Sequence, residues 1–140
     1  MAKHAYHDHL TSVPLFAGLN NDELDTVAHA ATQLDYKAGK VLMREGEVAH
    51  EMFVVVDGTL EVTRDGQFFA DIEPGGFAGE MALLTRAHRN STVSAKTDVS
   101  VLHIDGREFA TVLESAPLIA SKLLPVVAGR MAENSDNPCN

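Results

Sequence analysis

Residues 52–72 read MFVVVDGTLEVTRDGQFFADI, and this stretch decides the fold because it holds three strand signals separated by two turns. The continuous apolar run 52–56 is typical of a strand buried in a sandwich or barrel. Asp57-Gly58 turns the chain into the alternating segment 59–63, and Asp65-Gly66 is a strong two-residue hairpin signal before the third strand. Short strands at this close spacing favour a closed or double-sheet β structure over a parallel sheet.

Strand signals continue on both sides of this stretch. Residues 41–43 form a short apolar segment, and Pro74-Gly75-Gly76 predicts the next turn. Residues 91–95 and 99–104 predict two more strands around a polar turn. We therefore expect the region from Val41 to Ile104 to be the β part of the fold.

Helix signals lie before and after the β region. Asn20, with Glu23 three residues later, predicts a capped helix that ends near Thr32. A second cap signal, Asp105 with Glu108, opens another helix after the last strand. The β region is therefore flanked by helices on both sides in sequence.

A final helix is predicted to begin at Pro117. Pro125 lies inside it and should kink or break it, because proline lacks the backbone N–H. The expected fold class is mainly β with flanking helices: a jelly-roll-like, double-sheet β-roll with one N-terminal helix and two C-terminal helices. We expect one domain over residues 12–133, between flexible tails at residues 1–11 and 134–140.

Composition argues against several classes of partner. The formal net charge is −9 and the eleven basic residues are scattered, so nucleic acid is not expected as a partner. No apolar run approaches the length of a membrane span, and the N-terminus has no apolar signal core, so neither membrane insertion nor secretion is expected. The single cysteine, Cys139, can form no internal disulfide, which fits a cytoplasmic setting.

Residues 76–93 read GFAGEMALLTRAHRNSTV and carry the strongest functional signal. A glycine turn precedes a short apolar helix, with Glu80 at its start and Arg89 nine residues on. Backbone amides at a helix start favour an anion, and a guanidinium can clamp phosphate through parallel hydrogen bonds. Because a carboxylate repels phosphate, Glu80 makes sense if it accepts a hydrogen bond from a neutral hydroxyl on the same ligand. A phosphate with an adjacent hydroxyl indicates a nucleotide.

The order of these elements, together with residues 78–84 and 88–93, resembles the cyclic nucleotide-binding domain. The phosphate-binding cassette of that family runs approximately Phe-Gly-Glu-Leu-Ala-Leu, a variable segment, then Pro-Arg-Ala-Ala-Thr-Val. A second family signature fits residues 46–49 followed by 52–58. The family occurs in catabolite-activator-type regulators, in regulatory subunits of cAMP-dependent kinase and in cyclic nucleotide-gated channels. The resemblance covers about residues 12–132, nearly the whole chain.

The resemblance implies a role for each matched residue. Arg89 would hold the equatorial oxygens of the cyclic phosphate, and Glu80 would accept a hydrogen bond from the ribose 2′-hydroxyl. The other implied ligand contacts come from the start of the short helix, the positions after the arginine and the strand entering the cassette: Gly79, Met81, Ala82, Asn90, Ser91, Phe69 and Ala70. We also expect Glu80 and Arg89 to interact with each other before a ligand arrives, since one charge of each sign keeps the cavity near neutral.

Two positions depart from the family pattern. His88 stands where the family has proline, and Asn90 stands where many members carry Ala and cGMP-selective ones often carry Thr. Because that Thr is missing, cAMP is favoured over cGMP. We do not expect the long dimer helix and helix-turn-helix of the transcription regulators. The expectation is a non-enzymatic sensor, without catalytic residues, metal or cofactor, that acts on an unidentified effector protein or through self-association.

Two other functions stay open at this point. A degenerate domain of the same fold could serve as a protein-interaction module without nucleotide, because Asn90 departs from the pattern and the C-terminus is short. A cupin-type metalloenzyme is a third class, since Pro74-Gly75-Gly76 suits a cupin turn. Against that class, no His-x-His pair precedes the turn within the barrel, where His50 is alone.

Overall fold

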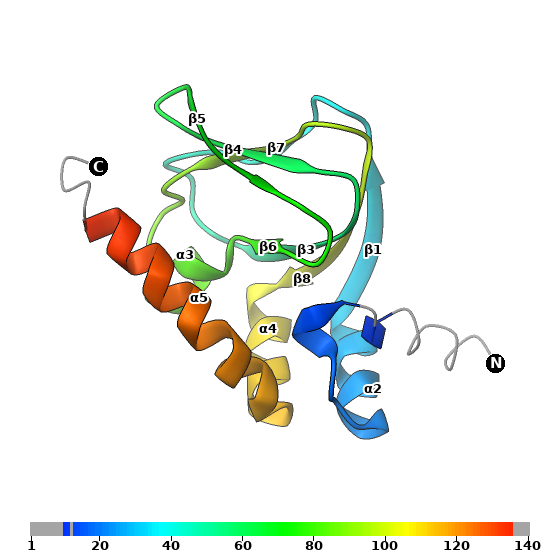
Figure 1. Ribbon diagram of the computed structural model, residues 1–140. Coiled ribbons are helices and arrows are strands. Elements are labelled where there is room, and N and C mark those ends of the chain that lie inside the picture. Colours follow the sequence, from blue (N-terminus) through cyan, green and yellow to red (C-terminus); the bar gives the residue numbers. More distant parts are fainter. Residues whose placement is uncertain (1–9, 12, 136–140) are drawn as a thin grey trace.

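The structure, a computed structural model, describes residues 10–11 and 13–135, and within them two four-stranded antiparallel sheets form the centre (Figure 1). The strand order is β1-β8-β3-β6 in one sheet and β2-β7-β4-β5 in the other. This is the double-sheet β-roll with flanking helices that the sequence predicts. The elements in chain order are η1 Pro14–Phe16, α2 Asn21–Ala30, β1 Ala31–Tyr36, β2 Val41–Met43, β3 Glu51–Asp57, β4 Leu60–Arg64, β5 Gln67–Ile72, β6 Phe77–Ala78, α3 Glu80–Thr85, β7 Thr92–Ala95, β8 Val99–Asp105, α4 Gly106–Ser115 and α5 Pro117–Ser135.

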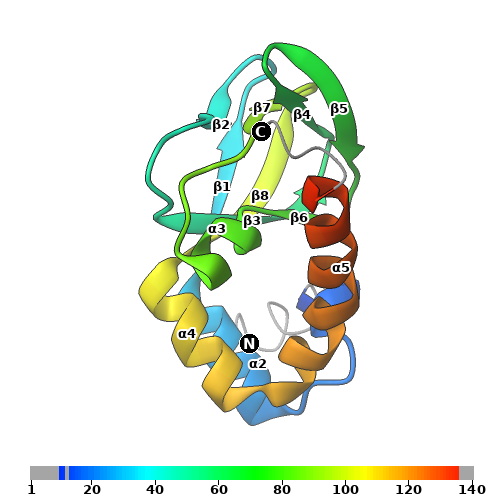
Figure 2. The ribbon, with the colours of Figure 1, turned by 90° about the vertical axis from the view of Figure 1, so that its left-hand side faces the viewer.

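Strand β3 shows why the run 52–56 is continuously apolar. Successive side chains of a strand point to opposite faces of the sheet. Met52 and Val54 pack on the outer face against the helices, whereas Phe53 and Val55 pack inside the roll against the second sheet. Figure 2 shows the helices gathered on one side of the roll. Both faces of β3 are therefore buried, each in a different core.

The predicted caps and hairpin are confirmed. The Asn20 side chain accepts from the Glu23 N–H at 2.8 Å and the Glu23 side chain accepts from the Asn20 N–H at 2.9 Å, closing a capping box on α2. Asp105 caps α4 by accepting from the Glu108 N–H at 2.8 Å. Strands β4 and β5 pair across the Asp65-Gly66 turn. The caps and the hairpin form between residues that are close in sequence, so the sequence alone is enough to predict them.

The structure differs from the expectations at three places. Helix α2 ends at Ala30, two positions before Thr32, and strand β1, which the sequence did not indicate, begins at Ala31. The two-residue strand β6 was also missed. Helix α5 continues through Pro125, so of the two expected outcomes, a kink or a break, the break is wrong. Proline removes the N–H that would bond to the Ser121 carbonyl, and both Pro125 and Ser121 are exposed residues.

Helix α5 is fixed to the rest of the domain along its first half. Ile119 and Leu123 are buried in the helix-side core. The Lys122 ammonium donates to the carbonyl oxygens of Pro14, at 2.9 Å, and of Ala17. The second half of α5 continues beyond these contacts to the roll, where Arg130 bonds to Glu80 at the start of α3.

Among the described residues, no single helix is long and apolar enough to cross a membrane. The helices Gly106–Ser115 and Pro117–Ala132 meet that length and composition test only when taken together, and they are bent by 115° relative to each other.

Candidate functional site

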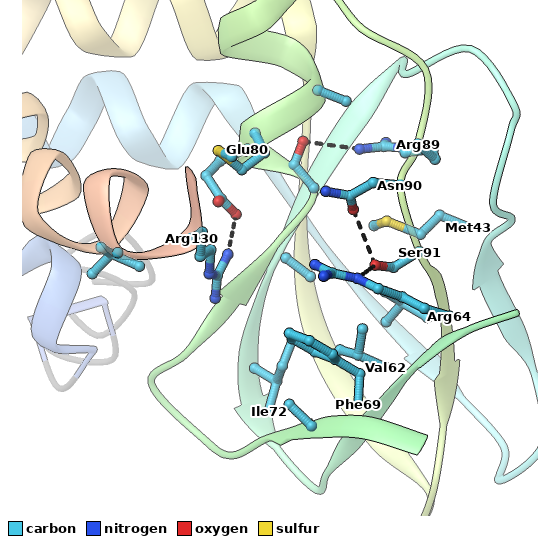
Figure 3. A pocket seen from close by; sticks show the side chains of 18 of the residues that line it. Met43, Val62, Arg64, Phe69, Ile72, Glu80, Arg89, Asn90, Ser91 and Arg130 are labelled. Atoms are coloured by element: carbon cyan, nitrogen blue, oxygen red, sulfur yellow. Dashed lines mark hydrogen bonds and ion pairs between the residues drawn. The ribbon is translucent and has the colours of Figure 1, made fainter. Parts of the chain in front are cut away.

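A cavity of about 360 Å³ opens between the inner face of β4 and β5, the start of α3 and the second half of α5 (Figure 3). This volume lies in the range of small-molecule sites. Charged side chains from α3 and the loop before β7 lie at one end, whereas Val62, Phe69 and Ile72 lie at the other. The cavity therefore suits a ligand that is polar at one end and apolar at the other.

Glu80 is the first residue of α3 and is fully buried, with an exposed fraction of 0%. Its Oε1 accepts from Arg130 Nη1 on α5 at 2.5 Å. Its Oε2 is buried and has no hydrogen-bond partner among the described residues. An unpartnered buried acceptor is costly, so Oε2 is an acceptor available to a hydroxyl in the cavity.

Arg89 is 5% exposed and is held by backbone carbonyl groups. Its Nη1 donates to the Gly79 carbonyl at 2.8 Å and its Nη2 donates to the Glu51 carbonyl. The Glu51 carboxylate lies 4.0 Å from Nη2. Burial lowers the pKa of Arg89 from its ordinary value, and the charges of Glu51 and Glu80 act in the opposite direction. Because an arginine stays protonated in proteins, the cavity contains a rigid cation.

Gly79 is the position where a side chain cannot be accommodated. It caps α3 with a left-handed φ of +96°. A Cβ there would lie 2.8 Å from Arg89 Nη1 and 2.9 Å from the Glu51 carbonyl oxygen. Glycine is therefore needed both for the backbone turn and for the close approach of the guanidinium.

The expected interaction of Glu80 with Arg89 is electrostatic and does not involve a direct ion pair. Glu80 forms its ion pair with Arg130, and Arg89 bonds to carbonyl oxygens. Glu80 still acts on Arg89 at longer range, since its charge raises the pKa of the guanidinium. The sequence could not indicate Arg130, because the contact depends on α5 continuing past Pro125.

All nine residues predicted for the site line this one cavity, from Phe69 and Ala70 on β5 to Asn90 and Ser91 before β7. That they contact a ligand stays a prediction. The sequence missed eleven further lining residues, most of them on β4, β5 and α5: Met43, Val62, Arg64, Asp71, Ile72, Ala78, Val93, Pro125, Val126, Gly129 and Arg130. The alternation of β4 was a signal for Val62 and Arg64, which point inward with Leu60.

A hydrogen-bonded chain joins the strands to the segment after Arg89. Arg64 Nε donates to Ser91 Oγ at 2.8 Å, and Ser91 Oγ donates to Asn90 Oδ1 at 3.0 Å (Figure 3). The Asn90 amide oxygen thereby accepts one hydrogen bond within the protein and keeps a second lone pair, and the NH₂ group supplies donors.

No group of three or more His, Cys, Asp or Glu side chains within the described residues is arranged to hold a metal ion.

Comparison with known proteins identifies what this site resembles. The sequence profile of the family described as "Cyclic nucleotide-binding domain" matches residues 33–116. The chain is 37% identical over 111 residues to the cyclic nucleotide-gated potassium channel mll3241 of Mesorhizobium japonicum, covering 79% of this chain and 31% of the channel. It is 30% identical over 112 residues to the cAMP-dependent protein kinase regulatory subunit of Schizosaccharomyces pombe, covering 79% of this chain and 27% of that protein.

Solved structures share the fold. A structure of cAMP-bound PfPKA-R (141-441) superposes with a TM-score of 0.84 at 24% identity, covering 97% of this chain and 47% of that chain. The catabolite activator protein of Thermus thermophilus superposes with a TM-score of 0.76 at 26% identity, covering 89% and 61%. The chain spans about a third or less of the length of the curated relatives named above.

Proposed function

The chain belongs to the cyclic nucleotide-binding domain family, and from this membership we propose that it binds a cyclic nucleotide monophosphate, cAMP in preference to cGMP. In this proposal it acts as a non-enzymatic, cytoplasmic regulatory domain on a separate partner. The ligand is the small molecule sensed, and no metal or cofactor takes part.

The buried carboxylate of Glu80 beside the buried guanidinium of Arg89 supports this proposal most strongly. Arg89 supplies a fixed cation for the cyclic phosphate, and the unpartnered Oε2 of Glu80 supplies an acceptor for the 2′-hydroxyl. The first backbone amides of α3, including those of Met81 and Ala82, have no acceptor within the helix and add donors at the same end. A phosphate and a neighbouring hydroxyl are thereby matched by one charge and one acceptor.

The preference for cAMP rests on Asn90. It stands where cGMP-selective members of the family often carry Thr, and the absence of that Thr is what supports cAMP.

The pair between Glu80 and Arg130 suggests how binding is transmitted. Glu80 belongs to the ligand site and Arg130 to α5, and the two are joined at 2.5 Å. A hydroxyl that donates to Oε2 polarises and reorients the carboxylate whose other oxygen holds α5. Lys122 anchors the first half of the helix, whereas the part after Pro125 is held by Arg130 and by the packing of Val127, so a change at Glu80 acts on this second part. A ligand shifts such an equilibrium only through its different affinity for the two positions of the helix.

Calorimetric titration with cAMP and cGMP tests the proposal. We expect one site per chain, tighter binding of cAMP, and a thermal shift of the protein by saturating cAMP. Replacing Arg89 with Gln should weaken binding by about 100-fold or more, because a buried charge partner of the phosphate is lost. Arg107→Met, an exposed substitution on α4, serves as the control and should leave the affinity unchanged.

Hydrogen exchange of α5 with and without cAMP tests the transmission step. Amides of residues 126–132 should change their exchange rate when cAMP binds, whereas the anchored residues 118–124 should not. The absence of heat and of any thermal shift at millimolar cAMP and cGMP would refute binding. Binding with unchanged exchange throughout α5 would refute transmission through this helix.

A further inference from the structure

Arg64 occupies a position where a β-roll normally places an apolar side chain. It is the last residue of β4, and alternation along the strand directs it inward with Leu60 and Val62. Leu60 is fully buried and Val62 is 9% exposed, so this face belongs to the interior. An arginine here costs solvation free energy unless its guanidinium has partners.

The protein fixes one edge and one face of this guanidinium and leaves the rest free. Nε donates to Ser91 Oγ at 2.8 Å, and the guanidinium carbon lies 3.8 Å from the centre of the Phe69 ring (Figure 3). The four outer N–H groups have no hydrogen-bond partner among the described residues. They line the cavity, where a ligand can accept from them.

Phe69 owes its place to an irregularity in β5. The pairs Val62↔Ala70 and Thr63↔Phe68 leave Phe69 as an extra residue opposite β4. Such a bulge re-aims a side chain. Phe69 is 41% exposed and Phe68 61%, and only Phe69 carries the Arg64 guanidinium over its ring, so the bulge supplies the aromatic face that Arg64 contacts.

Arg64 is also the cation of this cavity that no acid neutralises. Arg130 is paired with Glu80, and Asp71 is paired with Lys96 at 2.9 Å. Arg89 has the Glu51 carboxylate at 4.0 Å. In the described part of the chain, Arg64 takes part in no ion pair.

We propose that Arg64 is a specificity-determining residue that recognises the nucleobase, donating from its outer N–H groups to the edge of a purine. This inference rests on the proposed function, since it concerns the base of the same ligand. The argument is positional: with phosphate and ribose at Arg89 and Glu80, the aromatic base lies toward Phe69, Val62 and Ile72, where Arg64 is fixed.

The chemistry of the base edge explains why a purine fits. Adenine and guanine both present the N7 acceptor, and guanine adds the O6 acceptor beside it. Cytosine presents an amino donor on the corresponding edge, which an arginine cannot satisfy. Arg64 therefore separates purines from cytosine. Between the two purines it finds a second acceptor only in guanine, so the proposed preference for cAMP has to come from the residues after Arg89 and not from Arg64.

Three cyclic phosphates and two variants test this role. The ligands are cAMP, cCMP and methyl riboside 3′,5′-cyclic phosphate, which has no base, each titrated by protein-observed NMR so that millimolar affinities are measurable. Arg64→Met keeps the length and apolar stem but removes the donors, and Arg64→Lys keeps the charge without the planar fork. Arg107→Met is the control.

In Arg64→Met, cAMP affinity should fall about tenfold or more, as for loss of a hydrogen bond from a charged donor, while the base-free phosphate should bind as in the parent chain. The preference for cAMP over cCMP should shrink by the same factor, and Arg64→Lys should lie between the two. The loss for cGMP should be at least as large as for cAMP.

An equal loss for cAMP and for the base-free phosphate would overturn the proposal, because Arg64 would then contact phosphate. Unchanged cAMP affinity in a folded Arg64→Met protein would also overturn it. If the Arg64→Met variant does not fold, the same comparison of cAMP with the base-free phosphate is made with the Arg64→Lys variant. A parent chain that binds none of these ligands would instead refute the proposed function, and the two failures are thereby distinguishable.

Discussion

Replacement of Arg130 by Met is expected to destabilise the ligand-free protein by about 2–3 kcal/mol, because it leaves the Glu80 carboxylate buried without its cation. Glu80 is 0% exposed and its Oε1 lies 2.5 Å from Arg130 Nη1. Its second oxygen has no partner among the described residues that could compensate. The variant also loses the bond from Arg130 Nη2 to the Phe77 carbonyl, at 3.0 Å.

The magnitude follows from the burial of the two partners. Two unit charges about 4 Å apart attract by about 4 kcal/mol at an effective dielectric constant near 20. Removal of one partner from a fully buried pair costs about 3–5 kcal/mol. The Arg130 side chain is 30% exposed, so water already screens part of the attraction. The expected cost of removing Arg130 is therefore about 2–3 kcal/mol, at or below the low end of that range. For a chain of 140 residues, this loss corresponds to a fall in melting temperature of about 8 °C.

The assay is urea unfolding of four proteins: the parent chain, Arg130→Met, Glu80→Gln and the double variant. We expect Glu80→Gln to cost less than Arg130→Met, because a neutral amide tolerates burial better than an unpaired carboxylate. The double variant should recover part of the loss, with a coupling free energy of about 1.5 kcal/mol or more. A coupling below about 0.5 kcal/mol would refute the reasoning, since the pair would then contribute nothing beyond its separate members. Arg107→Met controls for the loss of an exposed arginine.

Two further predictions concern the glycine before α3 and the loss of folding stability at low pH. Gly79→Ala should destabilise the protein by more than Gly39→Ala, although both glycines have a left-handed φ, +96° and +94°, because only the Cβ at position 79 would collide with Arg89. Equal losses in urea unfolding would show that the collision relaxes without cost. The Asp98 carboxylate accepts from the Ala38 N–H at 2.9 Å and lies 3.6 Å from Lys37, and these contacts hold the pKa of Asp98 below its ordinary value. Its stabilising contribution is therefore present above the ordinary pKa of about 3.9 and is lost as pH falls through the lower folded-state pKa. In the Asp98→Asn variant, the free energy of unfolding should fall less steeply as the pH drops below the ordinary pKa of aspartate. An NMR titration that gives Asp98 an ordinary pKa would contradict this prediction.

Local sequence signals predicted the parts of the fold that short-range physics decides. The capping box at Asn20, the cap at Asp105 and the hairpin at Asp65-Gly66 each depend on neighbours within a few positions. Strand β1 was missed because its sequence, ATQLDY, follows a helix without a turn signal. Its strand conformation comes from pairing with β8, as in the register of Ala31 with Ile104. No periodicity within the segment encodes that partner.

The same division holds for the site. The nine predicted residues come from two short segments, 69–70 and 79–91, whose motifs depend on spacing along the chain, and all of them line the cavity. The sequence by itself determined a phosphate-and-hydroxyl pattern in Arg89 and Glu80, since turn, helix start and guanidinium are local. Only the tertiary structure decided which groups those two charges meet. Burial in the roll gave Arg89 two carbonyl partners, and the path of α5 brought Arg130 to Glu80 across fifty positions of sequence. These contacts depend on how segments far apart in the sequence pack together, and a motif read along the chain carries no information about that packing.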